Sequence, residues 1–142
     1  MGDAGELAGL RWTWRTTEHD ESGMERSVFD AAFGEWMHEH RESHTPFVAD
    51  EGGASVGMAW LATLERVPGP GVWRRLGGAV QSVYVLPEHR GHGLGSALVQ
   101  AVVSEARSNG LGYLIVHPSE RAFPLYRRLG FGESGRVLEL RF

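Results

Sequence analysis

The chain lacks two residue types, and each absence removes a class of chemistry. None of its 142 residues is cysteine, so disulfide bonds, cysteine-ligated zinc sites and thiol nucleophiles are excluded. All 14 basic residues are arginine, and no lysine occurs. A P-loop and Schiff-base catalysis both require lysine. The sequence therefore excludes those two functions as well.

Long apolar runs are also missing. The sequence contains no apolar stretch of about 18 or more residues and no signal-peptide pattern. Basic runs interleaved with aromatic residues, which are typical of nucleic-acid binding, are absent too. We expect a soluble, cytoplasmic protein that binds neither membranes nor nucleic acid.

What remains is an ordinary globular composition with an uneven distribution of charge. Hydrophobic residues make up 42% and charged residues 23%, and we expect a flexible tail over residues 1–9 and a single domain over 10–142. Residues 1–51 hold 12 acids and 4 arginines, whereas 52–142 hold 6 acids and 10 arginines. This asymmetry favours an anionic ligand in the C-terminal part and a cationic partner, such as an amine, in the N-terminal part.

Hydrophobic periodicity predicts strands and helices in alternation. The predicted strands are 10–15, 46–49, 55–64, 79–85 and 113–117, with one or two more over 131–142. The predicted helices are 23–42, 93–108 and 119–128, and the glycine- and proline-rich segment 65–78 is predicted to be a long surface loop. Because a helix joins the strands 79–85 and 113–117, these two strands should be parallel.

The most informative motif links the strand 79–85 to the helix that follows it. It reads Arg90, Gly91, His92, Gly93, Leu94, Gly95, Ser96. The first N–H groups of a helix lack intrahelical acceptors, and the helix dipole adds positive charge there. Glycines let an anion approach these groups closely, so the motif predicts a phosphate site. A P-loop ending is absent, and the dinucleotide pattern fails because Ser96 occupies its sixth position.

A second motif narrows the prediction to one family. The segment 90–95 fits the pattern Arg/Gln-x-x-Gly-x-Gly/Ala, and roughly 30 residues later comes the run Leu125, Tyr126, Arg127, Arg128, Leu129, Gly130, Phe131. Together they resemble the GNAT family, the GCN5-related N-acetyltransferases, strongly over 79–132 and elsewhere only in the order of elements. The resemblance implies an α/β (α+β) fold: a mixed, mostly antiparallel sheet of six to seven strands, a parallel pair that splays apart, and helices on both faces.

The resemblance also implies a reaction and a set of binding residues. An acetyl group would pass from acetyl-CoA to a primary amine by direct attack, without a metal. The backbone of Val83 and Val85 would hold the pantetheine arm and the thioester. The loop that would cradle the pyrophosphate consists of Arg90, Gly91, His92, Gly93, Leu94, Gly95 and Ser96. Ser119, where many members have asparagine, would contact the cofactor arm, and Tyr126 would protonate the departing thiolate.

The base that deprotonates the amine stays open at this point. His117 is the first candidate, because it ends the predicted strand 113–117 and imidazole titrates near neutral pH. Glu65, Glu18, His19 or a water molecule are the alternatives.

The missing base also leaves a second function open, a noncatalytic acyl-CoA-binding or sensor module of the same fold. The acceptor is expected to be a small-molecule or peptide amine of unidentified structure. The spacing of His38, His40 and His44 does not by itself bring metal ligands together, so no metal site is predicted. A homodimer would use exposed Trp73 or the last strand.

Overall fold

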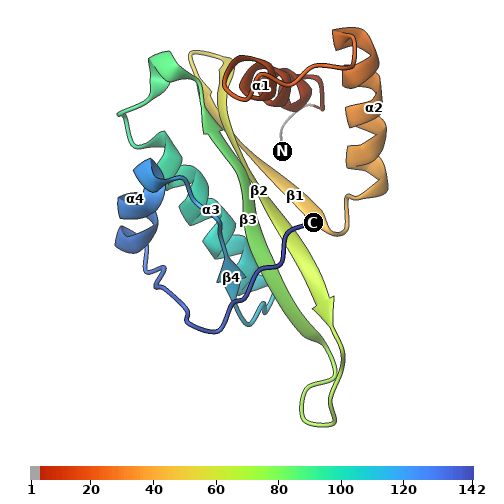
Figure 1. The fold of residues 1–142 in the computed structure, drawn as a ribbon, viewed down its shortest axis with the longest axis vertical. Coiled ribbons are helices and arrows are strands. Elements are labelled where there is room, and N and C mark those ends of the chain that lie inside the picture. Colours follow the sequence, from red (N-terminus) through yellow and green to blue (C-terminus); the bar gives the residue numbers. More distant parts are fainter. Residues whose placement is uncertain (1–3) are drawn as a thin grey trace.

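Four strands form one sheet in the order β1-β2-β3-β4 in the computed structural model, which describes residues 4–142 (Figure 1). The strands are β1 (His44–Glu51), β2 (Ala54–Arg66), β3 (Arg75–Val85) and β4 (Leu114–Ile115). β1, β2 and β3 pair antiparallel, whereas β3 and β4 pair parallel. The sheet is therefore mixed and mostly antiparallel, as predicted, but the prediction of six to seven strands was wrong.

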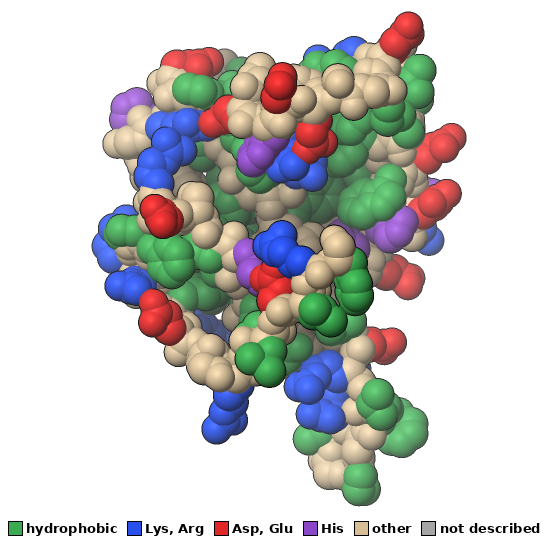
Figure 2. Space-filling model, in the orientation of Figure 1, with side chains coloured by type: hydrophobic (Ala, Val, Ile, Leu, Met, Phe, Trp, Pro, Cys, Tyr) green, Lys and Arg blue, Asp and Glu red, His purple; other side chains and the backbone are tan. Residues whose placement is uncertain are grey.

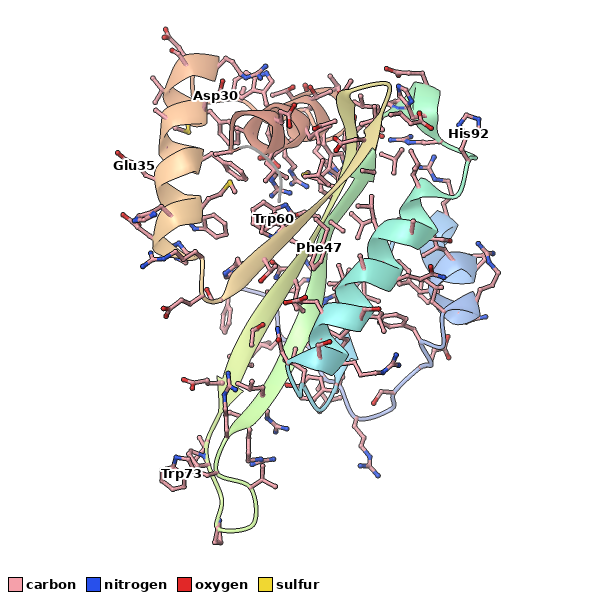
Figure 3. The ribbon with its side chains drawn as sticks, turned by 180° about the vertical axis from the view of Figure 1, so that it is seen from behind. Asp30, Glu35, Phe47, Trp60, Trp73 and His92 are labelled. Atoms are coloured by element: carbon pink, nitrogen blue, oxygen red, sulfur yellow. The ribbon has the colours of Figure 1, made fainter. Side chains whose placement is uncertain are left out.

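Helices cover both faces of this sheet (Figures 1 and 3). α1 (Ala4–Thr17) and α2 (Arg26–Glu39) cover one face, and α3 (Leu94–Ser108) and α4 (Phe123–Arg128) cover the other. Two short 3₁₀ turns complete the described elements, η1 (Pro87–His89) and η2 (Glu120–Ala122). The helices predicted over 23–42, 93–108 and 119–128 correspond to α2, α3 and the η2–α4 segment.

The core has two halves, separated by the sheet. On one face the α3 residues Leu98, Val99 and Val102 pack against alternate residues of β2, such as Leu61. On the other face Leu7 and Leu10 of α1 pack against the intervening residues, such as Met58 and Trp60. Because both faces of β2 are buried, its sequence is a nearly continuous apolar run.

The segment 10–15 was predicted to be a strand, but it belongs to α1. Leu7, Leu10 and Trp14 are separated by three and four residues, and Leu7 is fully buried while Leu10 is 5% exposed. The alternation of Leu10, Trp12 and Trp14 resembles a strand over six residues, but this helical spacing continues beyond it. Residues 4–9 of the predicted tail are part of the same helix, and residues 1–3 lie outside the described residues.

Much of the predicted loop 65–78 continues the β2–β3 hairpin instead. Arg66 pairs with Arg75, so only residues 67–74 connect the two strands. The glycines that suggested a loop allow close packing: a Cβ at Gly77 would lie 2.2 Å from Cζ of Tyr113. A Cβ at Gly78 would lie 3.0 Å from the carbonyl oxygen of Ala62. The hairpin extends well beyond the rest of the molecule (Figure 1).

The C-terminal prediction was also wrong. Residues 131–142 form no strand, and the strand predicted over 113–117 is reduced to the two residues of β4. Leu138 is 95% exposed and Leu140 77% exposed, so the alternating pattern of this segment has no buried face. Alternation alone does not make a strand when no neighbour covers the apolar side chains. Within residues 4–142, no helix has both the length and the apolar character needed to span a bilayer.

Candidate functional site

The parallel strands β3 and β4 separate after a very short contact. They pair only at Gly78 with Leu114 and at Ala79 with Ile115. Just beyond, β3 contains a bulge, because Met58 pairs with Tyr84 whereas Trp60 pairs with Gln81. A bulge inserts an extra residue and bends its strand. The bend lies where the pairing with β4 ends.

Ser82 in this bulge has an unusual backbone conformation for a residue with a side chain. Its φ is 52°, in the left-handed region that few non-glycine residues occupy. Nη1 of Arg11, on α1, donates a hydrogen bond of 2.8 Å to the Ser82 hydroxyl. α1 therefore contacts β3 at the point where the strands diverge.

A groove of about 940 Å³ opens between the diverging strands. It is bordered by β3, the glycine loop with the first turn of α3, the segment that follows β4, α4 and the C-terminal end of α1. These elements come from distant parts of the sequence.

The glycine loop presents the N-terminus of α3 to this groove. Gly93 is the N-cap residue, with φ of 82°, and Gly91 has φ of 84°; both angles suit glycine. No side chain caps the helix. The N–H groups of its first turn thus remain available to a ligand, and the dipole of this 15-residue helix favours an anion there.

Nearly all residues predicted to bind the cofactor line the groove. They are Val83, Val85, Arg90, Gly91, Gly93, Leu94, Gly95, Ser96 and Ser119. His92 is the exception, since it does not line the groove and its side chain points away from the body in Figure 3. Ser119 is the N-cap residue of η2, but its hydroxyl makes no capping hydrogen bond.

Arg90 makes three contacts at the groove wall. Its Nε donates a hydrogen bond of 2.8 Å to the carbonyl oxygen of Val85. Its Nη2 lies 3.2 and 3.1 Å from the two carboxylate oxygens of Glu18. The guanidinium also lies over the ring of Tyr84, 5.6 Å from its centroid. Arg90 thus joins the glycine loop to β3 and to the segment after α1.

Tyr84 is buried between these groups. It is 3% exposed, and its ring stacks on Trp14 with centroids 5.5 Å apart. Burial raises the pKa of Tyr84, and the negative charge of Glu18 raises it further, while the positive charge of Arg90 opposes the shift. The phenol therefore keeps its proton around neutral pH and can donate a hydrogen bond.

Tyr126 reaches the groove from α4. It is 6% exposed, and its ring meets Phe131 edge-on with centroids 5.3 Å apart. Burial raises the pKa of Tyr126 above its usual value. The groove thus contains a phenol that keeps its proton throughout the neutral range and can donate a hydrogen bond to a group in the groove.

Three of the four candidate bases line the same groove. His117 follows β4 and is exposed, while Glu18 and His19 come from the segment after α1. Glu65 lies elsewhere, paired with Leu76 in the outer part of the hairpin, and it does not line the groove. Glu18 is already bound by Arg90. His117 therefore has the fewest competing contacts among the candidates that line the groove.

The charged residues of the groove favour an anionic ligand. Four arginines and one glutamate line it, namely Arg15, Arg90, Arg121, Arg128 and Glu18. Figure 2 shows basic side chains on the side of the molecule formed by α3 and α4, and acidic side chains along the opposite edge, near α2. Arginines and an uncapped helix N-terminus together suit a phosphate-bearing molecule.

Sequence reasoning missed the contribution of α1. Trp14 and Arg15 line the groove beside Glu18, and Arg11 contacts Ser82. The signal was present, because residues 11, 14, 15 and 18 have the spacing of one helix face. The strand assignment of 10–15 concealed it.

The histidines near α2 form a different cluster. The rings of His40 and His44 are 5.7 Å apart, and both contact Trp36. Among residues 4–142, no group of three or more histidine, aspartate or glutamate side chains is arranged to hold a metal ion. His38 is exposed and belongs to no such group.

Comparison with known proteins identifies the family. A model of the acetyltransferase (GNAT) family matches residues 7–131. This chain belongs to that family.

A curated relative and two solved structures illustrate the likeness. Glucosamine 6-phosphate N-acetyltransferase of Trypanosoma brucei brucei is 38% identical over 63 residues, 44% of this chain and 43% of that protein. The structure of a Trypanosoma brucei acetyltransferase has a TM-score of 0.74 and 26% identity, covering 100% of this chain and 96% of that one. The structure of a predicted acetyltransferase with acetyl-CoA from Clostridium acetobutylicum has a TM-score of 0.77 and 19% identity. It covers 99% of this chain and 92% of that one, and this likeness shows the fold alone. The chain spans less than half the length of the curated relatives that it matches.

Proposed function

We propose that this protein transfers an acetyl group from acetyl-CoA to a primary amine. The observation that carries the proposal is the groove between β3 and β4, which has an uncapped helix N-terminus at one wall and the protonated phenol of Tyr126 at another. Family membership and the curated relative named for amine acetylation support it. Acetyl-CoA, when bound, would supply an activated thioester.

Different residues of this chain would bind the phosphates and the thioester arm of acetyl-CoA. The first N–H groups of α3, with Arg90, Arg121 and Arg128, would bind the phosphates, because these hydrogen-bond donors and cations line the groove. The bent part of β3, including Val83 and Val85, pairs with no strand of residues 4–142 on the β4 side, and its backbone would hold the thioester arm. Ser119 would contact the same arm.

Proton transfer is assigned to two side chains. Tyr126 would donate a proton to the sulfur that departs, because it lines the groove and carries its proton at neutral pH. Burial raises its pKa and so makes it a weaker acid, and the transfer therefore depends on its position beside the sulfur. His117, exposed in the segment that follows β4, would accept the proton of the attacking amine. Direct attack needs no enzyme nucleophile, and the chain has no cysteine to provide a thiol.

The acceptor would enter beside α1. Trp14, His19 and Glu18 form that end of the groove, and their aromatic rings and carboxylate suit a small amine. Its identity remains to be found by screening, with amino-sugar phosphates, polyamines, aminoglycosides, amino acids and short peptides as the panel.

The screen has a simple readout in this protein. Free CoA thiol released from acetyl-CoA is measured with a thiol reagent, and the absence of cysteine removes any background from the protein. Thiol release that depends on one class of amine supports the proposal. Acetyl-CoA binding measured by calorimetry, with no thiol release across the whole panel, would instead favour a noncatalytic acyl-CoA sensor.

A further inference from the structure

The outer part of the β2–β3 hairpin, residues 64–75, exposes apolar and cationic side chains together. Val67 is 81% exposed and Trp73 79% exposed, and Leu64 and Val72 are exposed as well. Figure 2 shows these apolar and basic side chains on the projecting hairpin, and Figure 3 shows Trp73 near its end. Exposed apolar groups in such a cluster mark a site of association, and tryptophan and arginine are the residues that most often dominate binding energy.

This hairpin tip also carries unneutralised positive charge. It holds Arg66, Arg74 and Arg75 against a single carboxylate, Glu65, so its net charge is +2. None of the three arginines forms an ion pair with a carboxylate among residues 4–142: Arg66 lies over Tyr113, and Arg75 donates to a backbone carbonyl. The tip thus lacks both an apolar cover and anionic partners.

A second groove, of about 610 Å³, is apolar and acidic, whereas the hairpin tip is apolar and basic. Its apolar floor includes Phe47 of β1, the free edge strand of the sheet, and Ala97 and Ala101 of α3. Figure 3 places Phe47 between the sheet and α3, away from the hairpin tip. The charged residues that line it are all acidic, and they are Glu6, Asp50 and Glu105.

Two of these carboxylates are held close together. The hydroxyl of Ser55 lies 2.7 Å from Oε2 of Glu6 and 3.0 Å from Oδ1 of Asp50. One hydroxyl has a single proton, so it cannot donate fully to both acceptors. Within the described chain, Glu6, Asp50 and Glu105 form no ion pair. A guanidinium at this rim would neutralise two like charges that are held near each other.

We propose that the hairpin tip of one copy of this chain docks into the acidic groove of a second copy. The hairpin extends away from its own body, so it cannot fold back into its own groove (Figure 1). Trp73 would cover the apolar floor, and the arginines beside it would meet the three carboxylates of the rim. Each copy has one tip and one groove, so two copies related by a twofold axis would make both contacts at once. This interaction is independent of the proposed acetyl transfer.

The association is tested first by mass. Sedimentation over a range of concentrations should detect a dimer, and Trp73→Ala should raise its dissociation constant at least tenfold. Arg74→Glu and Glu105→Arg should each weaken the dimer, whereas the double variant should restore it, because both charges are reversed. Circular dichroism of each variant checks that it is folded.

Contact between the two surfaces is tested by disulfide trapping, which a cysteine-free chain makes unambiguous. Chains with Val72→Cys, beside Trp73 in the hairpin tip, are mixed with chains carrying Ala97→Cys, and in the control the second chain carries Gln100→Cys instead, at an exposed residue of α3 outside both grooves. The mixture of Val72→Cys with Ala97→Cys should form at least ten times more disulfide-linked heterodimer than the control mixture. A monomer at every concentration, equal trapping in both mixtures, or a dimer that Trp73→Ala leaves intact would each overturn the proposal. The last result would point to another surface, such as residues 131–142.

Discussion

Arg90 in the glycine loop and Glu18 after α1 form an ion pair with 3.1 Å between Nη2 and Oε2. The two residues are 72 positions apart in the sequence. Both line the groove between β3 and β4, hereafter the main groove. The pair therefore connects the proposed phosphate-binding wall with the proposed acceptor wall. About a third of each side chain is exposed, so the pair contributes little to folding, on the order of 0.2–1 kcal/mol.

Replacing Arg90 and replacing Glu18 should have different effects on CoA binding. Arg90→Gln should weaken CoA binding about tenfold, because it removes the charged hydrogen bond that we propose Arg90 makes to phosphate. Glu18→Gln keeps the arginine but removes a competing anion, so affinity should stay the same or increase. Calorimetry with CoA measures both. An equal loss of affinity in the two variants would mean that the pair only shapes the loop.

Tyr126→Phe should reduce turnover while leaving acetyl-CoA binding almost unchanged. A positioned acid typically contributes about 10²-fold or more to the rate, and phenylalanine keeps the ring that packs on Phe131. The expected result is a fall in kcat of that order with little change in KM, measured by thiol release. Tyr113→Phe is the matched control, since Tyr113 does not line the groove. Unchanged kcat at saturating acetyl-CoA would remove Tyr126 from its proposed role.

His117→Gln should lower kcat/KM by about 10²-fold, the usual contribution of a general base. It should also remove the acidic limb of the pH–rate profile, because glutamine has no titrating group. His92→Gln is the control: His92 is an exposed histidine that lies outside the groove. An acidic limb that persists in His117→Gln would transfer the role to His19 or to water.

The folded protein should lose stability as the pH decreases below about 6.5, because His44 resists protonation in the folded state. Burial lowers the pKa of His44 from its usual 6.5, and the neighbouring His40 lowers it further. The unfolded chain then binds a proton more readily than the folded one, so stability is lost as pH falls from 6.5 through the lower folded value. Thermal unfolding between pH 7 and pH 5 measures the slope. His44→Gln should flatten it, and the exposed His38→Gln should not.

One substitution should have opposite effects at two glycines. Gly78→Ala places its Cβ 3.0 Å from the Ala62 carbonyl oxygen and closer still to Leu111, so we expect a loss of about 1–3 kcal/mol. Gly34→Ala, in α2, meets no atom within 4 Å and should gain about 0.5–1 kcal/mol from helix propensity. Urea unfolding of both variants gives the comparison. A neutral Gly78→Ala would mean that β3 and the Leu111 side chain adjust freely.

The sequence predicted the central part of the fold better than its ends. The glycine loop and α3 were predicted well because phosphate-binding turns need particular residues at fixed positions, and the apolar spacing of α3 is regular. α1 was misassigned because Leu10, Trp12 and Trp14 alternate over too short a span to distinguish a helix from a strand. The length of the hairpin escaped prediction because Gly77 and Gly78 serve close packing against Tyr113 and Ala62, which depends on contacts distant in sequence.

Within the main groove, local motifs located the proposed phosphate wall but not the opposite one. Trp14 and Tyr84 are brought together by tertiary packing, and no short sequence motif predicts that contact. The ion pair of Glu18 with Arg90 likewise joins segments whose relation only the fold establishes.

Because β4 is only two residues long, the wall of the main groove that follows β4 is the wall that can move. Residues 116–119 leave the sheet after two paired positions, and no described strand pairs with them. Their amides lack the protection that the long β2–β3 ladder gives to its own, so local opening costs least free energy on this side. Accommodation of a bulkier thioester would thus come from movement of this segment, while the bent strand opposite would hold the reacting carbonyl, as proposed above.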